Sequence, residues 1–388
     1  MRRLVVRLPS DAGFGSRLRS PAVTARVGVW LGVAFGVCFL TGLVSHYAQN
    51  ADHPVPFPPS PVWGYRVTQG LHVVSGTAAV PLLLVKLWSV YPRLFRRPER
   101  GWRRVTLDLA ERGSVAVLVA TAIFQLATGL ANVSTWYPWD FSFRTTHYAV
   151  AWVVTGSILV HVAVKLPVIR AALGADVDDT AGDRPTAVVP GALSRRGLLR
   201  STWLASGVAV LATAGVTVPF LRTVSVLGVR SGTGPQGLPV NKAASQAGVT
   251  AAATRGDYRL TVVRGDRAVA LSRGELLALP QRTHVLPIAC VEGWSASGSW
   301  TGVAVRDLLD LVGAPAGSDV VVTSLQESGA YRTTVLQGSF TDDERSLLAL
   351  SLEGEPLSLD HGYPARIIAP DRPGVLQTKW VHRLEVSA

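Results

Sequence analysis

The 388-residue chain contains only two cysteines, Cys38 and Cys290. Cys38 lies within an apolar run, so the sequence offers no obvious disulfide partner for Cys290. A single thiolate outside a disulfide is a strong ligand for a soft transition metal. The alternative role is that of a buried structural cysteine, which is a common place for a free thiol. The residues around Cys290 must decide between the two.

Acidic residues are also scarce, with 26 Asp and Glu against 38 Lys and Arg, which gives a net charge of +12. The basic residues gather at the N-terminus, between Arg93 and Arg112, and between Arg184 and Arg200, each time beside a long apolar run. Cytoplasmic loops of membrane proteins have this distribution, whereas a groove for nucleic acid does not. We therefore expect membrane lipid, and no nucleic acid, as a partner.

Asp, Glu, Lys and Arg are absent from five apolar runs. Each run has about 20 residues, enough to cross a hydrocarbon core of about 30 Å. A buried helix of a soluble protein is the alternative for any single run, but five such runs between basic loops favour membrane crossings. The runs are Val27–Ser45, Val67–Val85, Gly113–Asn132, Thr145–Val164 and Ser201–Leu221.

The loops between the runs predict the orientation. The segments near Arg17, Arg97 and Arg196 are basic, whereas the loops 45–66 and 133–145 carry almost no Lys or Arg and are rich in Pro and Trp. By the positive-inside rule the N-terminus is cytoplasmic, and everything after the fifth run lies outside. No small-residue cleavage site follows a short apolar core, so we expect no removable signal peptide.

Beyond a Gly- and Ser-rich tether the pattern changes to mixed α and β structure. Strands are predicted from β-branched residues and partial alternation, and two short helices lie between them. The expected strands are Tyr258–Val263, Val320–Ser324, Tyr331–Leu336 and Lys379–Val386, and the expected helices are Ser272–Leu279 and Val305–Val312.

Two motifs in this part resemble one known family. Residues 288–302 read I-A-C-V-E-G-W-S-A-S-G-S-W-T-G, and residues 360–381 read D-H-G-Y-P-A-R-I-I-A-P-D-R-P-G-V-L-Q-T-K-W-V. In this order they resemble the sulfite oxidase family of molybdopterin oxidoreductases, and especially its bacterial branch with the periplasmic methionine sulfoxide reductase catalytic subunits. Sulfite oxidases and assimilatory nitrate reductases carry A-G-N-R after the cysteine, where this chain has V-E-G-W. The resemblance therefore does not single out sulfite as substrate.

The resemblance implies a Mo-molybdopterin cofactor and a role for each matching residue. Cys290 falls on the molybdenum ligand, and His361 and Arg366 fall on positions that contact the pterin and its phosphate. An arginine fork suits phosphate oxygens. The remaining implied pterin contacts are Asn241, Gln377, Thr378 and Lys379. Without the motif, Lys379 would be taken for a solvated charge next to a core aromatic.

Three histidines in the apolar runs suggest haem. Polar groups within a membrane helix are costly and point to function. His147 and His161 lie fourteen residues apart, on nearly one helix face, and His72 falls at the depth of His147. The pattern resembles the di-haem cytochrome b subunits of formate dehydrogenases and hydrogenases, and implies His72 and His147 as axial ligands of a haem b. His161 has no partner histidine, and an interfacial polar role is the alternative for His147.

Residues 194–200 read S-R-R-G-L-L-R, directly before the fifth apolar run. This resembles the twin-arginine export signal and implies the twin-arginine translocase as a partner during biogenesis. The alternative is ordinary positive-inside charge.

Together these patterns predict a membrane-bound molybdopterin oxidoreductase. The expected fold is an α-helical bundle of five transmembrane helices followed by a mixed α+β sulfite oxidase-like domain. It would act by oxygen-atom transfer on a small molecule or a sulfoxide- or sulfite-type substrate outside the cytoplasm, and exchange electrons with the quinone pool through haem b. Alternatives are a molybdopterin enzyme whose bundle is only an anchor, and a non-catalytic sensor or binding module. The expected parts are a cytoplasmic segment (1–26), a cytochrome b-like domain (27–170), a cytoplasmic loop (171–200), a fifth helix (201–222), a linker (223–237) and the catalytic domain (238–388).

Overall fold

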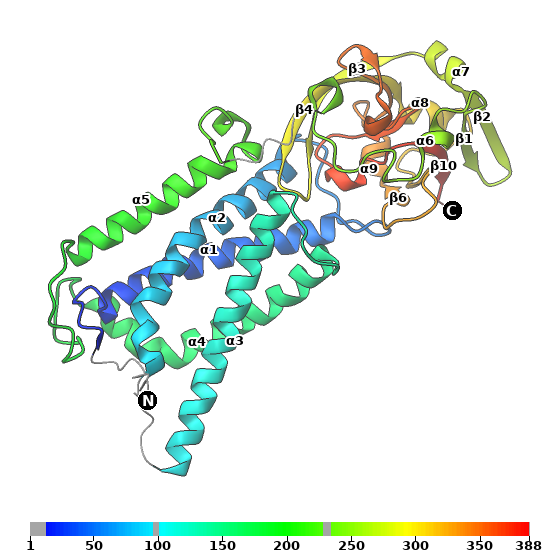
Figure 1. Ribbon diagram of the computed structural model, residues 1–388. Coiled ribbons are helices and arrows are strands. Elements are labelled where there is room, and N and C mark those ends of the chain that lie inside the picture. Colours follow the sequence, from blue (N-terminus) through cyan, green and yellow to red (C-terminus); the bar gives the residue numbers. More distant parts are fainter. Residues whose placement is uncertain (1–12, 96–100, 228–233, 388) are drawn as a thin grey trace, which may run out of the picture. The chain divides into compact units, whose positions relative to one another are not determined.

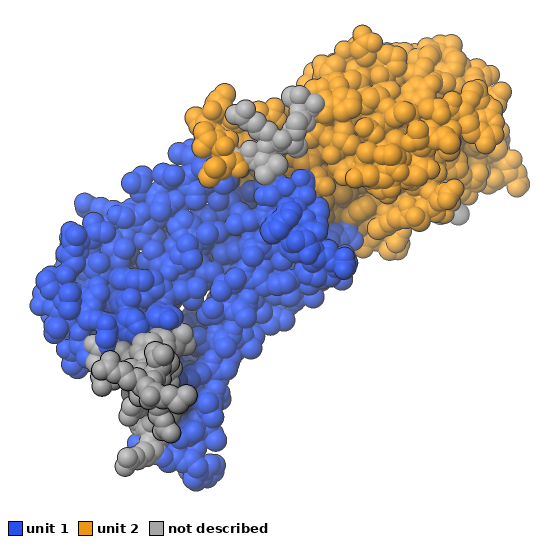
Figure 2. All heavy atoms as spheres, viewed as in Figure 1, with its two compact units in different colours: residues 1–40, 72–214 blue, residues 41–71, 215–388 orange. Residues whose placement is uncertain are grey.

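The computed structural model describes residues 13–95, 101–227 and 234–387 (Figure 1). They form two compact units, residues 1–40 with 72–214 and residues 41–71 with 215–388 (Figure 2). Parts of the predicted N-terminal segment, residues 1–12, and of the predicted linker, residues 228–233, lie outside the described residues. Residues 41–71, predicted as helix ends and their connection, belong to the same unit as the sheets.

The helical unit is built around four long helices with a shared apolar core. Phe35, Leu83, Ala122 and Val154, one from each helix, are buried together. The outward surfaces are also apolar, since Leu84 is 61% exposed, and a bilayer covers a surface of this kind. Four helices in the described residues are long and apolar enough to cross a membrane. The helices are α1 (Pro21–Ala48), α2 (Gly64–Val90), α3 (Trp102–Val133) and α4 (Phe143–Gly174).

The predicted fifth crossing is not confirmed. It corresponds to α5 (Arg195–Thr213), which begins with Arg195 and Arg196 and carries Arg200 within its second turn. The helix ends at Thr213 and continues into short 3-10 turns. Its uncharged part, residues 201–213, rises only about 20 Å at ~1.5 Å per residue, less than a hydrocarbon core of about 30 Å. Within its unit α5 packs on α2, where the Ser206 hydroxyl donates to the Ala78 carbonyl (3.0 Å).

The second unit contains two five-stranded sheets, as the mixed α+β prediction requires. In one sheet β1 and β10 are parallel neighbours, whereas the other pairs are antiparallel. In order, its strands are β2 (Arg267–Ser272), β1 (Arg259–Arg264), β10 (Val381–Val386), β5 (Val320–Ser324) and β6 (Thr333–Leu336). The other sheet runs β3 (Arg282–Ala289), β4 (Ser295–Ala304), β7 (Leu347–Leu352) and β8 (Glu355–Pro356), with β9 (Arg366–Ile368) paired to β7.

All four predicted strands are present, as β1, β5, β6 and β10. The two predicted helices are α7 (Arg273–Ala278) and α8 (Val305–Asp310). A reciprocal pair of bonds between Ser272 and Glu275 caps α7 at its N-terminus. Strands β3 and β4 flank Cys290, so the second sheet is the one that presents this residue.

Candidate functional site

Cys290 lies in the tight turn that joins β3 to β4, and its side chain is only 1% exposed. The Cys290 amide donates to the Trp294 carbonyl (2.9 Å), and the Gly293 amide donates to the Cys290 carbonyl (3.0 Å). A second segment presses on this turn, because a Cβ at Gly374 would stand 2.8 Å from the Ala289 carbonyl oxygen. Only glycine fits there. The two sequence motifs therefore meet at Cys290.

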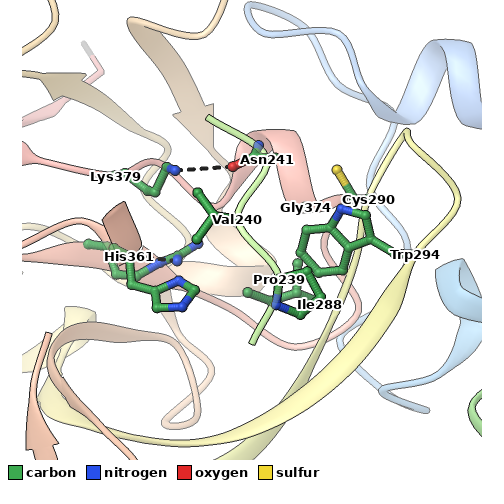
Figure 3. Close-up of a pocket in the computed structure, with 10 residues that line it drawn as sticks. Pro239, Val240, Asn241, Ile288, Cys290, Trp294, His361, Gly374 and Lys379 are labelled. Atoms are coloured by element: carbon green, nitrogen blue, oxygen red, sulfur yellow. Dashed lines mark hydrogen bonds between the residues drawn. The ribbon is translucent and has the colours of Figure 1, made fainter. Parts of the chain in front are cut away.

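The Cys290 turn forms one wall of a pocket drawn from three segments far apart in sequence. Figure 3 shows Cys290 and Trp294 on one side, His361 and Lys379 on the other, and the backbone of Val240 and Asn241 between them. The lining residues are Pro239, Val240, Asn241, Ile288, Cys290, Trp294, His361, Arg366, Gly374 and Lys379. Five of the seven residues that the sequence assigned to molybdopterin, namely Asn241, Cys290, His361, Arg366 and Lys379, thus share one pocket.

Arg366 brings a buried positive charge to this pocket. It is 4% exposed, and its guanidinium donates to the carbonyls of His361 and Gln377 (3.1 Å each) and lies 4.9 Å from the Trp300 ring centroid. Burial lowers the pKa of Arg366 to about 9. Among the described residues no ion pair joins Arg366 to a carboxylate. A buried charge of this kind is costly unless an anion balances it.

Lys379 is the second buried cation. Its ammonium donates to the Asn241 side-chain oxygen (3.1 Å) and to the Asp360 carbonyl (2.9 Å). Burial, and next the charge of Arg366, lower the pKa of Lys379 to about 7. A ligand phosphate would stabilise the protonated forms of both cations. The pocket thus fits the anionic end of a molybdopterin.

His361 lies between these cations as a neutral group. Burial, followed by the Arg366 charge, lowers the pKa of His361 to about 4, and its Nε2 lies 2.7 Å from the Pro235 carbonyl oxygen. Gly362 follows with a φ of 110°, and a Cβ there would stand 3.1 Å from the Cβ atoms of Arg366 and Lys379. Because residue 362 is a glycine, the backbone can bring His361, Arg366 and Lys379 close together.

Glu292 was not singled out from the sequence, although it lies inside the first motif. Its carboxylate accepts a hydrogen bond from the Trp294 indole (3.0 Å) and lies 3.9 Å from the Cys290 sulfur. Burial, and next the charge of Glu292, raise the pKa of Cys290, and burial raises the pKa of Glu292. A metal cation would favour the Cys290 thiolate. The sequence feature that could have identified Glu292 as a site residue is its position two residues after Cys290.

Gln377 and Thr378 are buried but do not line the pocket. The side-chain amide of Gln377 donates to the Ala369 carbonyl and accepts from the Ala369 backbone amide (2.8 Å each). The Thr378 hydroxyl lies 2.8 Å from the Thr334 hydroxyl. Both side chains therefore serve the fold around Arg366, and a direct contact with the pterin stays a prediction for them.

The helical unit brings together two of its three predicted haem ligands. The rings of His72 and His147 have centroids 6.3 Å apart. The His72 Nδ1 lies 2.9 Å from the Cys38 carbonyl oxygen, and the His147 Nδ1 lies 3.4 Å from the Thr128 hydroxyl. His161 is not part of this pair, and its charged neighbours include Lys86, Lys165 and Glu111.

Comparison with known proteins agrees with the pocket. Residues 246–388 match the family described as oxidoreductase molybdopterin binding domain. A putative protein-methionine-sulfoxide reductase subunit, YedZ1, from Azospira oryzae is 34% identical over 113 residues, covering 29% of this chain and 42% of that protein. Sulfite oxidase from Arabidopsis thaliana is 32% identical over 114 residues, covering 25% of this chain and 29% of that protein.

Among solved structures, the sulfane dehydrogenase SoxCD from Paracoccus pantotrophus matches 34% of this chain and 38% of its own, with 24% identity and a TM-score of 0.31. The chain thus spans less than half the length of each of these three relatives. The family match and the relatives indicate an oxidoreductase with a molybdopterin-binding domain, which confirms the predicted enzyme class.

Proposed function

We propose that this protein is a membrane-bound molybdopterin oxidoreductase that transfers an oxygen atom to or from a small molecule outside the cytoplasm. The observation that carries the proposal is that Cys290 shares a buried pocket with Arg366 and Lys379, two cations without a carboxylate partner in the described residues. When bound, the molybdenum cofactor supplies the two-electron oxygen-transfer chemistry. The chain supplies a thiolate, a positively charged cradle and exclusion of water.

Each residue of the pocket has a separate task in this proposal. Cys290 would hold the metal, since a soft thiolate suits it. The Arg366 fork and the Lys379 ammonium would bind the phosphate, which a neutral His361 does not repel. Trp300 lies over the guanidinium of Arg366 and keeps its plane fixed. Because these groups are buried, their bonds to an anion form in a low dielectric, where they are strong.

We further propose that His72 and His147 hold one haem b. The rings of His72 and His147 lie with their centroids 6.3 Å apart, so both imidazoles would be available to hold one metal, which would supply one-electron transfer. A bond from the His72 Nδ1–H to the Cys38 carbonyl favours the tautomer whose Nε2 carries the lone pair. A haem there would relay single electrons to or from the quinone pool.

The molybdenum and pterin contents of the full chain, purified from membranes, test the proposal. We expect about one molybdenum and one pterin per chain, a haem b band after dithionite reduction, and turnover with an artificial electron donor. Molybdenum without haem would leave a membrane-anchored enzyme. Neither molybdenum nor pterin would leave a sensor or binding module, and the proposed function would be lost.

Arg366→Ala is expected to lower pterin content, since it removes the fork that faces the phosphate. Loss of one charge-assisted contact, worth about 1.5–3 kcal/mol, corresponds to roughly 10- to 100-fold weaker binding. Arg366→Lys is the matched control, because it keeps the charge but not the fork, and should retain an intermediate amount. Pterin assayed after gel filtration measures the loss. Wild-type pterin content in Arg366→Ala would contradict the proposed cradle.

The twin-arginine proposal makes a separate prediction. We expect that Arg196→Lys prevents the sheet-containing unit from reaching the outside, as does deletion of the translocase. Arg196 suits this test because it is exposed and its ion pairs within the described residues are with Asp176 and Asp178, both exposed. Arg195, in contrast, is 5% exposed and bonds Asp183 and the carbonyls of Val177 and Asp179.

Asp183→Asn is the control for a folding defect. It weakens the anchoring of Arg195 and leaves the motif unchanged, so its sheet-containing unit should still be exported. Protease accessibility in spheroplasts reports the location. If the Arg196→Lys protein were exported normally in a strain without the translocase, residues 194–200 would not be an export signal. Their arginines would then act only as positive charge on the cytoplasmic side.

A further inference from the structure

The connection between α1 and α2 is hydrogen-bonded at several positions to the sheet-containing part of its own unit. We call residues 49–66 the connecting strap. The Val335 amide donates to the Ala51 carbonyl (2.9 Å), and the Gln337 side chain donates to the Pro54 carbonyl (2.7 Å). The Arg345 guanidinium reaches the Ser60 hydroxyl (2.9 Å). A loop that merely linked two helices would not need these bonds.

The strap ends on the segments that build the pocket. The Tyr65 amide donates to the Asp371 carboxylate (2.6 Å), and Asp371 lies in the second motif, three residues before Gly374. Because Tyr65 is in the first turn of α2, this carboxylate caps the helix from a distant part of the chain. The Arg66 guanidinium donates to the Ser297 hydroxyl on β4 (2.8 Å). Both motifs are thereby tied to the start of α2.

The Tyr65 ring lies against the Cys290 turn. It is 1% exposed and packs in an apolar cluster with Ala289, the residue before Cys290, and with Phe57 of the strap. In Figure 3 the pale blue ribbon of this early segment passes beside Cys290.

The Tyr65 hydroxyl is held in one position. It accepts hydrogen bonds from the side-chain amides of Gln49 (2.6 Å) and Gln69 (3.0 Å), which are 5% and 6% exposed. Gln69 also donates to the Ser45 hydroxyl. A buried, bonded network of this kind fixes its members in one arrangement, whereas apolar side chains could pack in several. The network therefore presents the Tyr65 ring to the Cys290 turn as a rigid surface.

We propose that Tyr65 is a positioning residue of the molybdenum site. Through Ala289 and the Cys290 turn it fixes the sulfur relative to Arg366 and Lys379, so that the strap adds a rigid contact on the Cys290 side of the site. The proposal rests on the proposed function for the role of Cys290. It adds a residue outside residues 246–388, the part that matches the molybdopterin-binding family.

Tyr65→Phe tests the proposal, because it keeps the ring and removes the hydroxyl. The matched control is Tyr258→Phe, which removes a buried hydroxyl that donates to the Val381 carbonyl (2.6 Å) within the other apolar core. Hydrogen exchange of the full chain, read on a peptide spanning residues 288–295, measures the Cys290 turn. We expect up to about tenfold faster exchange in Tyr65→Phe, on the scale of one lost hydrogen bond, and no change in Tyr258→Phe.

The Mo(V) electron paramagnetic resonance signal provides a second readout on the holoenzyme. Its g values should shift in Tyr65→Phe and in Asp371→Asn, which weakens the anchoring of the Tyr65 backbone, and stay unchanged in Tyr258→Phe. Unaltered exchange and unaltered g values in Tyr65→Phe would overturn the proposal, as would the same changes in Tyr258→Phe. If the wild type contained neither molybdenum nor pterin, the proposed function would fail, whereas the exchange data would still decide whether Tyr65 holds the turn.

Discussion

Cys290→Ser is expected to abolish turnover while the pterin stays bound. Serine has nearly the size of cysteine, but its oxygen is a harder and far less acidic ligand, so a soft metal loses its thiolate. The pterin contacts from Arg366 and Lys379 are not touched by the substitution. We expect activity with an artificial donor to fall by about 10³-fold or more, as for an essential catalytic group.

The measurements are molybdenum content, pterin content and activity on the same preparation. Cys38→Ser is the matched control, because it replaces the other cysteine, in the helical unit, and should keep molybdenum and donor activity. A Cys290→Ser protein with wild-type turnover would refute both the ligand assignment and the proposed function. Loss of pterin together with activity would instead show that the thiolate anchors the whole cofactor.

The position of Cys290 in a pocket could be predicted from the sequence. Each of the two motifs is one continuous run of residues, and two such motifs in this order identify the site more specifically than either motif alone. The meeting of Cys290 with Arg366 and Lys379 followed from those motifs, and strands such as β1 and β10 followed from their β-branched residues. Strands β3 and β4 were not predicted, because Pro287 and Gly298 interrupt the alternation. Both strands are held by pairing across the sheet, which a local pattern does not record.

Tertiary contacts also explain what else the sequence missed. The strap has the composition of an exposed outer loop, yet Ala51 and Pro54 accept bonds from residues about 280 positions later in the chain. The sequence did not show that the side-chain amide of Gln377 bonds the backbone of Ala369, and a contact of Gln377 with the pterin stays a prediction. For the helices, the apolar runs and the basic loops between them predicted five crossings, whereas four candidate spans are found among the described residues, and α5 begins with arginines. The roles of polar residues were thus harder to predict than those of apolar residues, because the role of a polar side chain depends on a single hydrogen-bond partner that can lie far away in the sequence.

His72→Ala and His147→Ala are each expected to remove the haem b signal. His72 and His147 would together hold the haem iron, so loss of either imidazole would remove one of the two ligands that a low-spin haem b requires. The measurement is the dithionite-reduced spectrum of purified membranes, with haem content by pyridine haemochrome. Each variant should lose at least the haem that His72 and His147 share.

His161→Ala is the matched control for the histidine pair. It removes a histidine from the same helix as His147 but at a site where Lys86 and Glu111, rather than a second histidine, are the neighbours. Its spectrum should retain one low-spin haem b. Molybdenum content should stay at the wild-type level in all three variants, since none of them lies in the unit that contains Cys290. A full low-spin spectrum in both His72→Ala and His147→Ala would exclude the pair as axial ligands and leave the helical unit as an anchor.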